Sequence, residues 1–170
     1  GRGVVKCFSF EDAAFFKALN PDCITVVRMY TKEQHIGGDP MHAAAEYIAT
    51  FHDSLMRHHE SVDFIASWND MNSSSHRENN RWMVDFGRHF AYGIAALNIH
   101  TKASILTVAV GNPLEDWVPD LIPAVRAIHE TGGALGYHSY WWCNPTTNGQ
   151  HEMESWWPWH AGRWQRWDEV

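Results

Sequence analysis

The feature of this sequence that most constrains its fold is a regular alternation between short apolar runs and longer amphipathic segments. Five short apolar runs are predicted to form buried strands, at positions 3–8, 23–30, 62–68, 104–110 and 134–140. Helix-capping signals open the segments between them, as at Ser9 and at Asp39-Pro40. Continuous apolar strands separated by helices are typical of a parallel sheet with right-handed crossovers. The sequence therefore predicts an α/β fold.

The segments between the strands are predicted to be helices that pack one face against the sheet, the first of them at positions 10–19. Apolar residues recur at helical spacing in the other three. They are Ala44, Ile48, Phe51 and Leu55, then Trp82, Phe86, Phe90, Ile94 and Leu97, then Trp117, Leu121, Ala124, Val125 and Ile128. The last helix is predicted to end at Gly132-Gly133.

Two architectures fit this order of elements: an open doubly wound sheet, or part of a (β/α)8 barrel. A complete barrel takes about 250 residues. Because the chain has 170 residues and five strands, the barrel interpretation makes positions 1–170 a single incomplete domain. A partial barrel exposes strand edges and one side of its core, and such edges favour aggregation. We therefore expect poor solubility of the segment by itself.

Composition and motifs argue against several classes of partner and cofactor. The net charge of −7 and the lack of any Lys/Arg run argue against nucleic acid, and the apolar runs are too short to cross a bilayer. No Gly-rich phosphate loop follows the first strand and no HExxH motif occurs, so we expect no cofactor and no metal. Three cysteines argue against a disulfide framework, and Cys7 and Cys23 are expected to be buried. Localisation, extracellular or cytoplasmic, and oligomeric state remain open.

Polar and aromatic side chains gather where the predicted strands end. The carboxyl ends of parallel strands are where α/β proteins place their functional groups. The candidates are Arg28 on the second strand, Trp68, Asn69 and Asp70 on the third, Asn112 after the fourth, and His138, Tyr140, Trp141 and Trp142 on the fifth. One carboxylate, several amides, an imidazole, a phenol, a cation and aromatic rings together suit recognition of a carbohydrate.

Two of these motifs carry a family resemblance. Trp68-Asn69-Asp70 and His138-Ser139-Tyr140 resemble the strand-four Asn-Glu and strand-six His-x-Tyr motifs of the retaining glycoside hydrolases of clan A, which are (β/α)8 barrels. The chain most resembles poorly characterised bacterial members of that clan. The resemblance implies that the five strands are barrel strands two to six, without the first strand and the last two.

The resemblance also implies catalytic roles. Retaining hydrolysis uses two carboxyl groups about 5–5.5 Å apart, one as acid/base and one as nucleophile. Asp70 takes the acid/base position, and Asn69 is expected to hydrogen-bond the sugar 2-hydroxyl. His138 and Tyr140 are expected to orient the nucleophile and the substrate. The nucleophile itself is expected outside these residues, so we expect the 170 residues alone to be inactive.

The remaining candidates are expected to bind substrate. Arg28 is expected to keep a carboxylate ionised by charge pairing, although a structural ion pair is an equally good interpretation. Trp68, Trp141 and Trp142 are expected to stack on sugar rings, and Asn112 to contact the substrate.

One departure from the clan motif leaves alternatives open. Asp70 stands where the clan has Glu, and its arm is one methylene shorter. Errors of 1 Å in the position of a catalytic group can cost about 10²-fold in rate. The alternatives are therefore a catalytically inactive carbohydrate-binding barrel and, on an open sheet, an α/β enzyme of another class.

Overall fold

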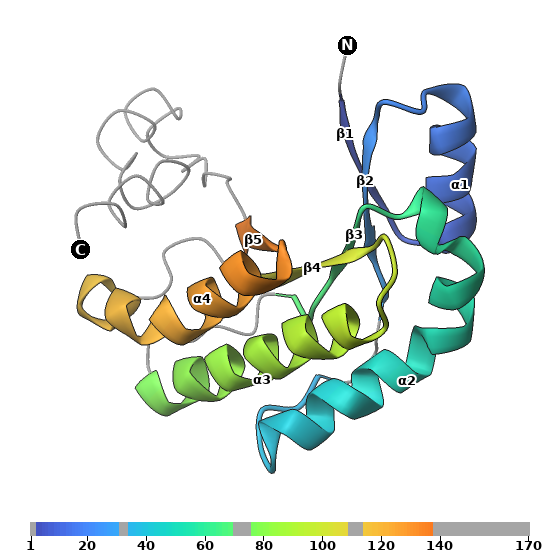
Figure 1. The fold of residues 1–170 in the computed structure, drawn as a ribbon. Coiled ribbons are helices and arrows are strands. Elements are labelled where there is room, and N and C mark those ends of the chain that lie inside the picture. The colour runs from blue at the N-terminus through green and yellow to red at the C-terminus, as the bar shows by residue number, and fades with distance from the viewer. Residues whose placement is uncertain (1–2, 31–33, 70–75, 109–113, 138–170) are drawn as a thin grey trace, which may run out of the picture.

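The computed structural model describes residues 3–30, 34–69, 76–108 and 114–137 (Figure 1). The strands are β1 Val4–Cys7, β2 Ile24–Arg28, β3 Phe64–Ala66, β4 Lys102–Val108 and β5 Ala134–Tyr137. The helices are α1 Phe10–Leu19, α2 Pro40–His58, α3 Arg77–Ala96 and α4 Ile122–Thr131, with short 3-10 helices η1 His59–Ser61 and η2 Glu115–Leu121. This alternation confirms the predicted α/β fold.

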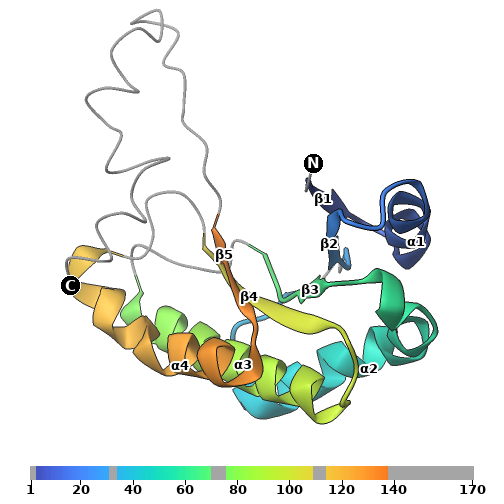
Figure 2. The ribbon, with the colours of Figure 1, turned by 45° about the horizontal axis from the view of Figure 1, so that its top comes forward.

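The five strands form one parallel sheet in the order β1-β2-β3-β4-β5, which is also their order along the chain. The four helices lie side by side along the outer side of the curved sheet (Figure 2). A doubly wound sheet reverses its strand order at a switch point and has helices on both faces. The described elements show neither feature, so the open doubly wound alternative has no support in them.

The core lies between the sheet and the helices. One row of cross-strand partners, Cys7, Val27, Ile65 and Ala103, is at most 3% exposed and belongs to the core cluster. Because side chains alternate along a strand, the neighbouring positions lie on the other face of the sheet. On that face Lys6, Val26 and Phe64 are exposed or half-buried, whereas Ala66 and Ser104 near the carboxyl edge are buried. Within the described residues, helices therefore cover one face of the sheet.

The predicted helix caps are confirmed. The Ser9 hydroxyl accepts a hydrogen bond from the backbone N–H of Asp12 at 3.0 Å, and α1 follows. The Asp39 carboxylate accepts one from the N–H of Met41 at 3.0 Å, with Pro40 at the first position of α2. α4 ends at Gly132, whose φ of 68° lies in the left-handed region that favours glycine.

The packed face predicted for the fourth helix is wrong in part. Val125 was predicted to face the core, but it is 45% exposed. The segment begins as the 3-10 helix η2, which contains Pro119, and becomes α-helical at Ile122. A 3-10 helix has 3.0 residues per turn, so the apolar face turns by a different angle per residue there. The buried positions follow an i, i+3 spacing, at Val118, Leu121, Ala124 and Ala127.

An irregularity interrupts β4 close to its carboxyl end. The pairing of β4 with β5 shifts register between Ile105 and Val108. Within this shift Leu106 has a φ of +51°, which is uncommon for a residue other than glycine. On the facing strand, a β-carbon added to Gly136 would lie 2.9 Å from Thr107 Oγ1 and 3.1 Å from Thr107 Cα. The close approach of the two strands therefore requires glycine at this position.

We expect Gly136→Ala to lower the free energy of unfolding by about 1–3 kcal/mol, because the added methyl group overpacks against backbone atoms. Gly3→Ala is the matched control, since a β-carbon there meets nothing within 4 Å. Surface changes of this kind usually stay within about 0.5 kcal/mol. Urea unfolding of both variants measures the difference, and equal midpoints would show that the strands separate at no cost.

Candidate functional site

The candidate site lies where β2 and β3 end, at what we call the carboxyl edge of the sheet. Arg28 is the last residue of β2 and the cross-strand partner of Ala66, the last residue of β3. Asn69 follows β3 and forms an isolated bridge with Thr107 of β4. Its backbone N–H donates to the Gln34 side-chain oxygen at 3.3 Å. The end of β3 is thereby held between β4 and the loop that follows β2.

The structure brings three predicted site residues, Arg28, Trp68 and Asn69, to this one edge. The other predicted site residues lie outside the described residues: Asp70, Asn112, His138, Tyr140, Trp141 and Trp142. Their roles therefore stay predictions.

Trp68 is a packing residue of this edge. It is 8% exposed, and its ring centroid lies 4.3 Å from that of Phe86 and 5.7 Å from that of Trp82, both on α3 and both in stacked geometry. Tyr47 meets the indole edge-on at 6.0 Å. The aromatic residues of α3 thus belong to the core, as predicted. Because little indole surface remains for a sugar ring, we leave Trp68 out of the stacking residues proposed below.

Arg28 is half-buried and lies beside an aromatic ring. Its guanidinium carbon is 5.8 Å from the centroid of the Phe8 ring, a cation–π distance. Its Nε is buried and has no hydrogen-bond partner among the described residues. No described carboxylate lies within ion-pair distance of the guanidinium. The structural ion pair considered for Arg28 is therefore not found in the described part of the chain.

Arg28 Nε is not the one buried polar atom here without a hydrogen-bond partner among the described residues. The Ser67 hydroxyl and the Trp68 indole N–H are buried and also lack a partner among the described residues. Proteins satisfy more than nine in ten of their buried polar groups, so each exception calls for an explanation. Arg28 Nε–H and the Trp68 indole N–H can only donate. The Arg28 Nε–H is therefore a buried donor whose acceptor is not among the described residues.

A cavity of about 360 Å³ opens beside this edge, between the loop after β2 and the first turns of α2. Its polar lining includes His35, Asp39, His42 and Glu46, and its floor includes Tyr47 and Trp68. Both carboxylates are already engaged: Asp39 caps α2, and Glu46 pairs with His42 at 3.2 Å. Sequence reasoning missed this cavity. Its one sequence signal is a long loop after a strand end, where binding residues often lie.

The Tyr47 phenol is a structural group. It is 3% exposed and donates to the carbonyl oxygen of Ala66 at 3.3 Å. Burial raises its pKa well above the ordinary value, against the opposing effect of the Arg28 charge. The phenol is therefore neutral at physiological pH and cannot serve as a base there.

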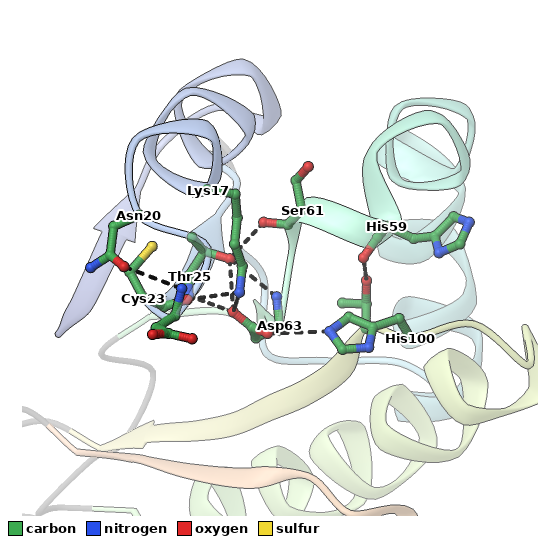
Figure 3. A network of polar contacts seen from close by, with 10 residues as sticks. Lys17, Asn20, Cys23, Thr25, His59, Ser61, Asp63 and His100 are labelled. Carbon is green, nitrogen blue, oxygen red and sulfur yellow. Dashed lines mark hydrogen bonds and ion pairs between the residues drawn. The ribbon is translucent and has the colours of Figure 1, made fainter. Parts of the chain in front are cut away.

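A polar network lies at the opposite edge, where β2, β3 and β4 begin (Figure 3). One oxygen of Asp63 accepts hydrogen bonds from the Thr25 N–H at 2.7 Å and from Lys17 Nζ at 2.8 Å. The other oxygen contacts His100 Nε2 at 3.2 Å. Lys17 also donates to the Cys23 carbonyl oxygen at 2.7 Å. Since parallel α/β sheets place their functional groups at the carboxyl ends of the strands, this network is assigned to stability.

Cys7 and Cys23 are buried and free, as predicted. Over the described ranges, no three His, Cys, Asp or Glu side chains are grouped closely enough to hold a metal ion. None of the described helices has the length and hydropathy needed to span a membrane.

Comparison with known proteins gives no relative. No family model matches the chain, and no curated protein and no solved structure matches it either.

Proposed function

We propose that β1 to β5 are strands two to six of a (β/α)8 barrel, and that the complete protein is a glycoside hydrolase-like enzyme acting on O-glycosidic bonds. The sequential strand order and the single layer of helices support the barrel. Such a sheet leaves its second face uncovered, and closing it into a barrel buries that face. In the proposal the half-buried row that includes Val26 and Phe64 lies inside the closed barrel.

The observation that carries the functional part is the convergence at the carboxyl edge. The end of β3, with Asn69, lies between Arg28 of β2 and Thr107 of β4. In barrel enzymes this edge holds the catalytic groups. Asp70 comes next in the sequence, so the acid/base position of the clan motif follows a strand end that packing holds firmly.

In the proposed mechanism Asp70 protonates the leaving-group oxygen and later activates water. Asn69 hydrogen-bonds the sugar 2-hydroxyl, and His138 and Tyr140 orient the second carboxylate and the substrate. The second carboxylate, on a later barrel strand and about 5–5.5 Å from the first, attacks the anomeric carbon and displaces the leaving group to form a covalent glycosyl-enzyme. Water then hydrolyses this intermediate, and the two displacements give retention of configuration. Asn112, Trp141 and Trp142 are the proposed substrate contacts.

Asp70→Asn in the complete protein is expected to lower kcat/KM on aryl glycosides by about 10²-fold or more, because general acid catalysis typically contributes 10²–10⁴-fold. The loss should be larger for phenyl than for dinitrophenyl glycosides, since a good leaving group needs no proton. Asp70→Glu keeps the ionisable group and should retain activity. Asp53→Asn, a change at a residue 90% exposed on α2, is the matched control. Unchanged activity in Asp70→Asn would remove the acid/base role.

The second candidate is a carbohydrate-binding barrel that has lost catalysis. The shorter arm of Asp70, in place of the clan's Glu, favours it. It predicts saccharide binding with no hydrolysis by either the wild type or Asp70→Asn.

A further inference from the structure

All charged side chains on the five strands are positive. The five strands carry Lys6, Arg28 and Lys102 and no acidic residue. Lys6 is the cross-strand partner of Val26, two positions before Arg28, so Lys6 and Arg28 belong to the same face of the sheet. Strand geometry puts their Cα atoms roughly 8 Å apart. The described strand residues therefore give this face a positive charge near its carboxyl edge, in a protein whose net charge is −7.

The restrained guanidinium of Arg28 suits a planar hydrogen-bond acceptor such as a carboxylate. Its guanidinium lies over the Phe8 ring. Because Phe8 is 59% exposed, the pair lies at the protein surface. Stacking on a ring restrains the guanidinium plane, and the N–H groups along its edge match the two oxygens of a carboxylate. Among the described residues none supplies that carboxylate.

The hydrogen bonding of the Arg28 guanidinium supports the same interpretation. The guanidinium Nε–H is a buried donor that lacks an acceptor in the described part of the chain. Leaving a buried donor unsatisfied is unfavourable, and more so for a charged group. An anionic oxygen ligand beside Arg28 brings the missing acceptor and offsets the desolvation of the guanidinium.

We propose that Arg28, assisted by the charge of Lys6, binds the carboxylate of an acidic sugar, so that the substrate class is saccharides containing uronic acid. The sugar part of this inference rests on the proposed function. The anion part rests on Arg28, Phe8 and the charge of the strands alone.

Calorimetric titration of the protein with methyl glucuronide, methyl glucoside and inorganic phosphate tests the proposal. The wild type is expected to bind the glucuronide about tenfold or more tightly than the glucoside, because hydrogen bonds between charged groups are worth about 1.5–3 kcal/mol. Arg28→Gln should abolish this preference. Arg28→Lys, which keeps the charge and loses the planar fork, should retain part of it. Arg126→Gln, at an exposed arginine of α4, is the matched control and should change nothing.

Each of the other outcomes contradicts a specific part of the proposal. Equal affinity for glucuronide and glucoside, or a preference that survives Arg28→Gln, removes the anion site and leaves the carbohydrate function standing. An acid of the polypeptide itself, such as Asp70, would then be the partner of Arg28. Phosphate bound as tightly as the glucuronide means a site for free anions and removes the sugar. If no ligand binds, the acidic-sugar site is overturned, and activity on aryl glycosides decides the proposed function separately.

Discussion

Phe86→Ala is expected to lower the free energy of unfolding by about 3–5 kcal/mol, the usual range for truncation of a buried phenylalanine. Phe86 is fully buried, and its ring stands at the centre of an aromatic cluster on the inner side of α3. Its centroid lies 4.3 Å from Trp68, 5.5 Å from Trp82 and 6.2 Å from Phe90. Removing the ring leaves a cavity between the sheet and α3, and the loss of these contacts adds to the transfer free energy.

The matched control is Phe15→Ala, because Phe15 is 60% exposed on α1 and its truncation removes little buried area. Its effect is expected to stay within about 0.5 kcal/mol. Phe86→Leu should fall between the two, since it keeps most of the buried volume. Denaturant unfolding followed by circular dichroism gives all three values. Equal losses for Phe86→Ala and Phe15→Ala would show that the described packing does not set stability.

The same ring links the core to the candidate site. Trp68 precedes Asn69 and Asp70 in the sequence and stacks directly on Phe86. The position of the strand end therefore depends on how α3 packs against the sheet. Because a misplacement of about 1 Å can cost 10²-fold in rate, we expect Phe86 variants to weaken any activity carried by Asp70 beyond their effect on stability.

The sequence predicted those parts of the fold that local chemistry determines. Ser9 and Asp39 have side-chain oxygens that bond backbone N–H groups a few residues away, so the starts of α1 and α2 could be predicted from a few residues. Gly132 stops α4 in the same local way. The period of the aromatic residues on α3 predicted the core face, with Phe86 and Phe90 fully buried.

Features that depend on contacts between distant segments were harder to predict. The third strand was predicted at positions 62–68, but β3 covers only Phe64–Ala66. Ile65 and Trp68 both join the helix-side core although they are three residues apart, which strict strand alternation does not allow. The regular strand ends at Ala66, although the Ser67 N–H still donates to the Ser104 carbonyl oxygen at 2.8 Å, and Trp68 then packs in the aromatic cluster. The phase of α4 was missed for a similar reason, since η2 precedes it.

The location of the candidate site could be predicted from the sequence, but its packing could not. Apolar runs that end in polar residues located Arg28 and Asn69 at one edge, because parallel strands end on the same side. The burial of Trp68 and the cavity beside His35 and His42 depend on the packing of α2 and α3 against the strand end. No local sequence pattern reports such packing.

Asp63→Asn is the second change with a large expected effect, a loss of about 2–4 kcal/mol, because a largely buried charged acceptor is removed while its donors remain. Asp63 and Lys17 are each 18% exposed and form an ion pair at 2.8 Å. The carboxylate also accepts the N–H of Thr25, so it joins the starts of β2 and β3 with the end of α1 (Figure 3). The neutral amide keeps the shape and loses the charge-assisted bonds.

Asp85→Asn is the matched control, since Asp85 also forms an ion pair, with Arg88, but is 47% exposed. Exposed pairs of this kind are worth about 0–1 kcal/mol. Unfolding midpoints at neutral pH compare the two variants directly. If they lose the same amount, the network around Asp63 contributes no more than a surface pair.

The dependence of stability on pH gives an independent test of the same carboxylate. Burial alone would raise the pKa of Asp63, but hydrogen bonds from Lys17, the Thr25 N–H and His100 outweigh it and hold the pKa below its ordinary value. The unfolded chain therefore binds this proton at higher pH than the folded protein does. The stabilisation is complete above the ordinary carboxyl pKa and is lost as the pH falls through the lower, folded value. Wild-type stability should fall more steeply with acid than that of Asp63→Asn, so the two curves converge at low pH. Parallel curves would mean that Asp63 has the same pKa in the folded and unfolded states.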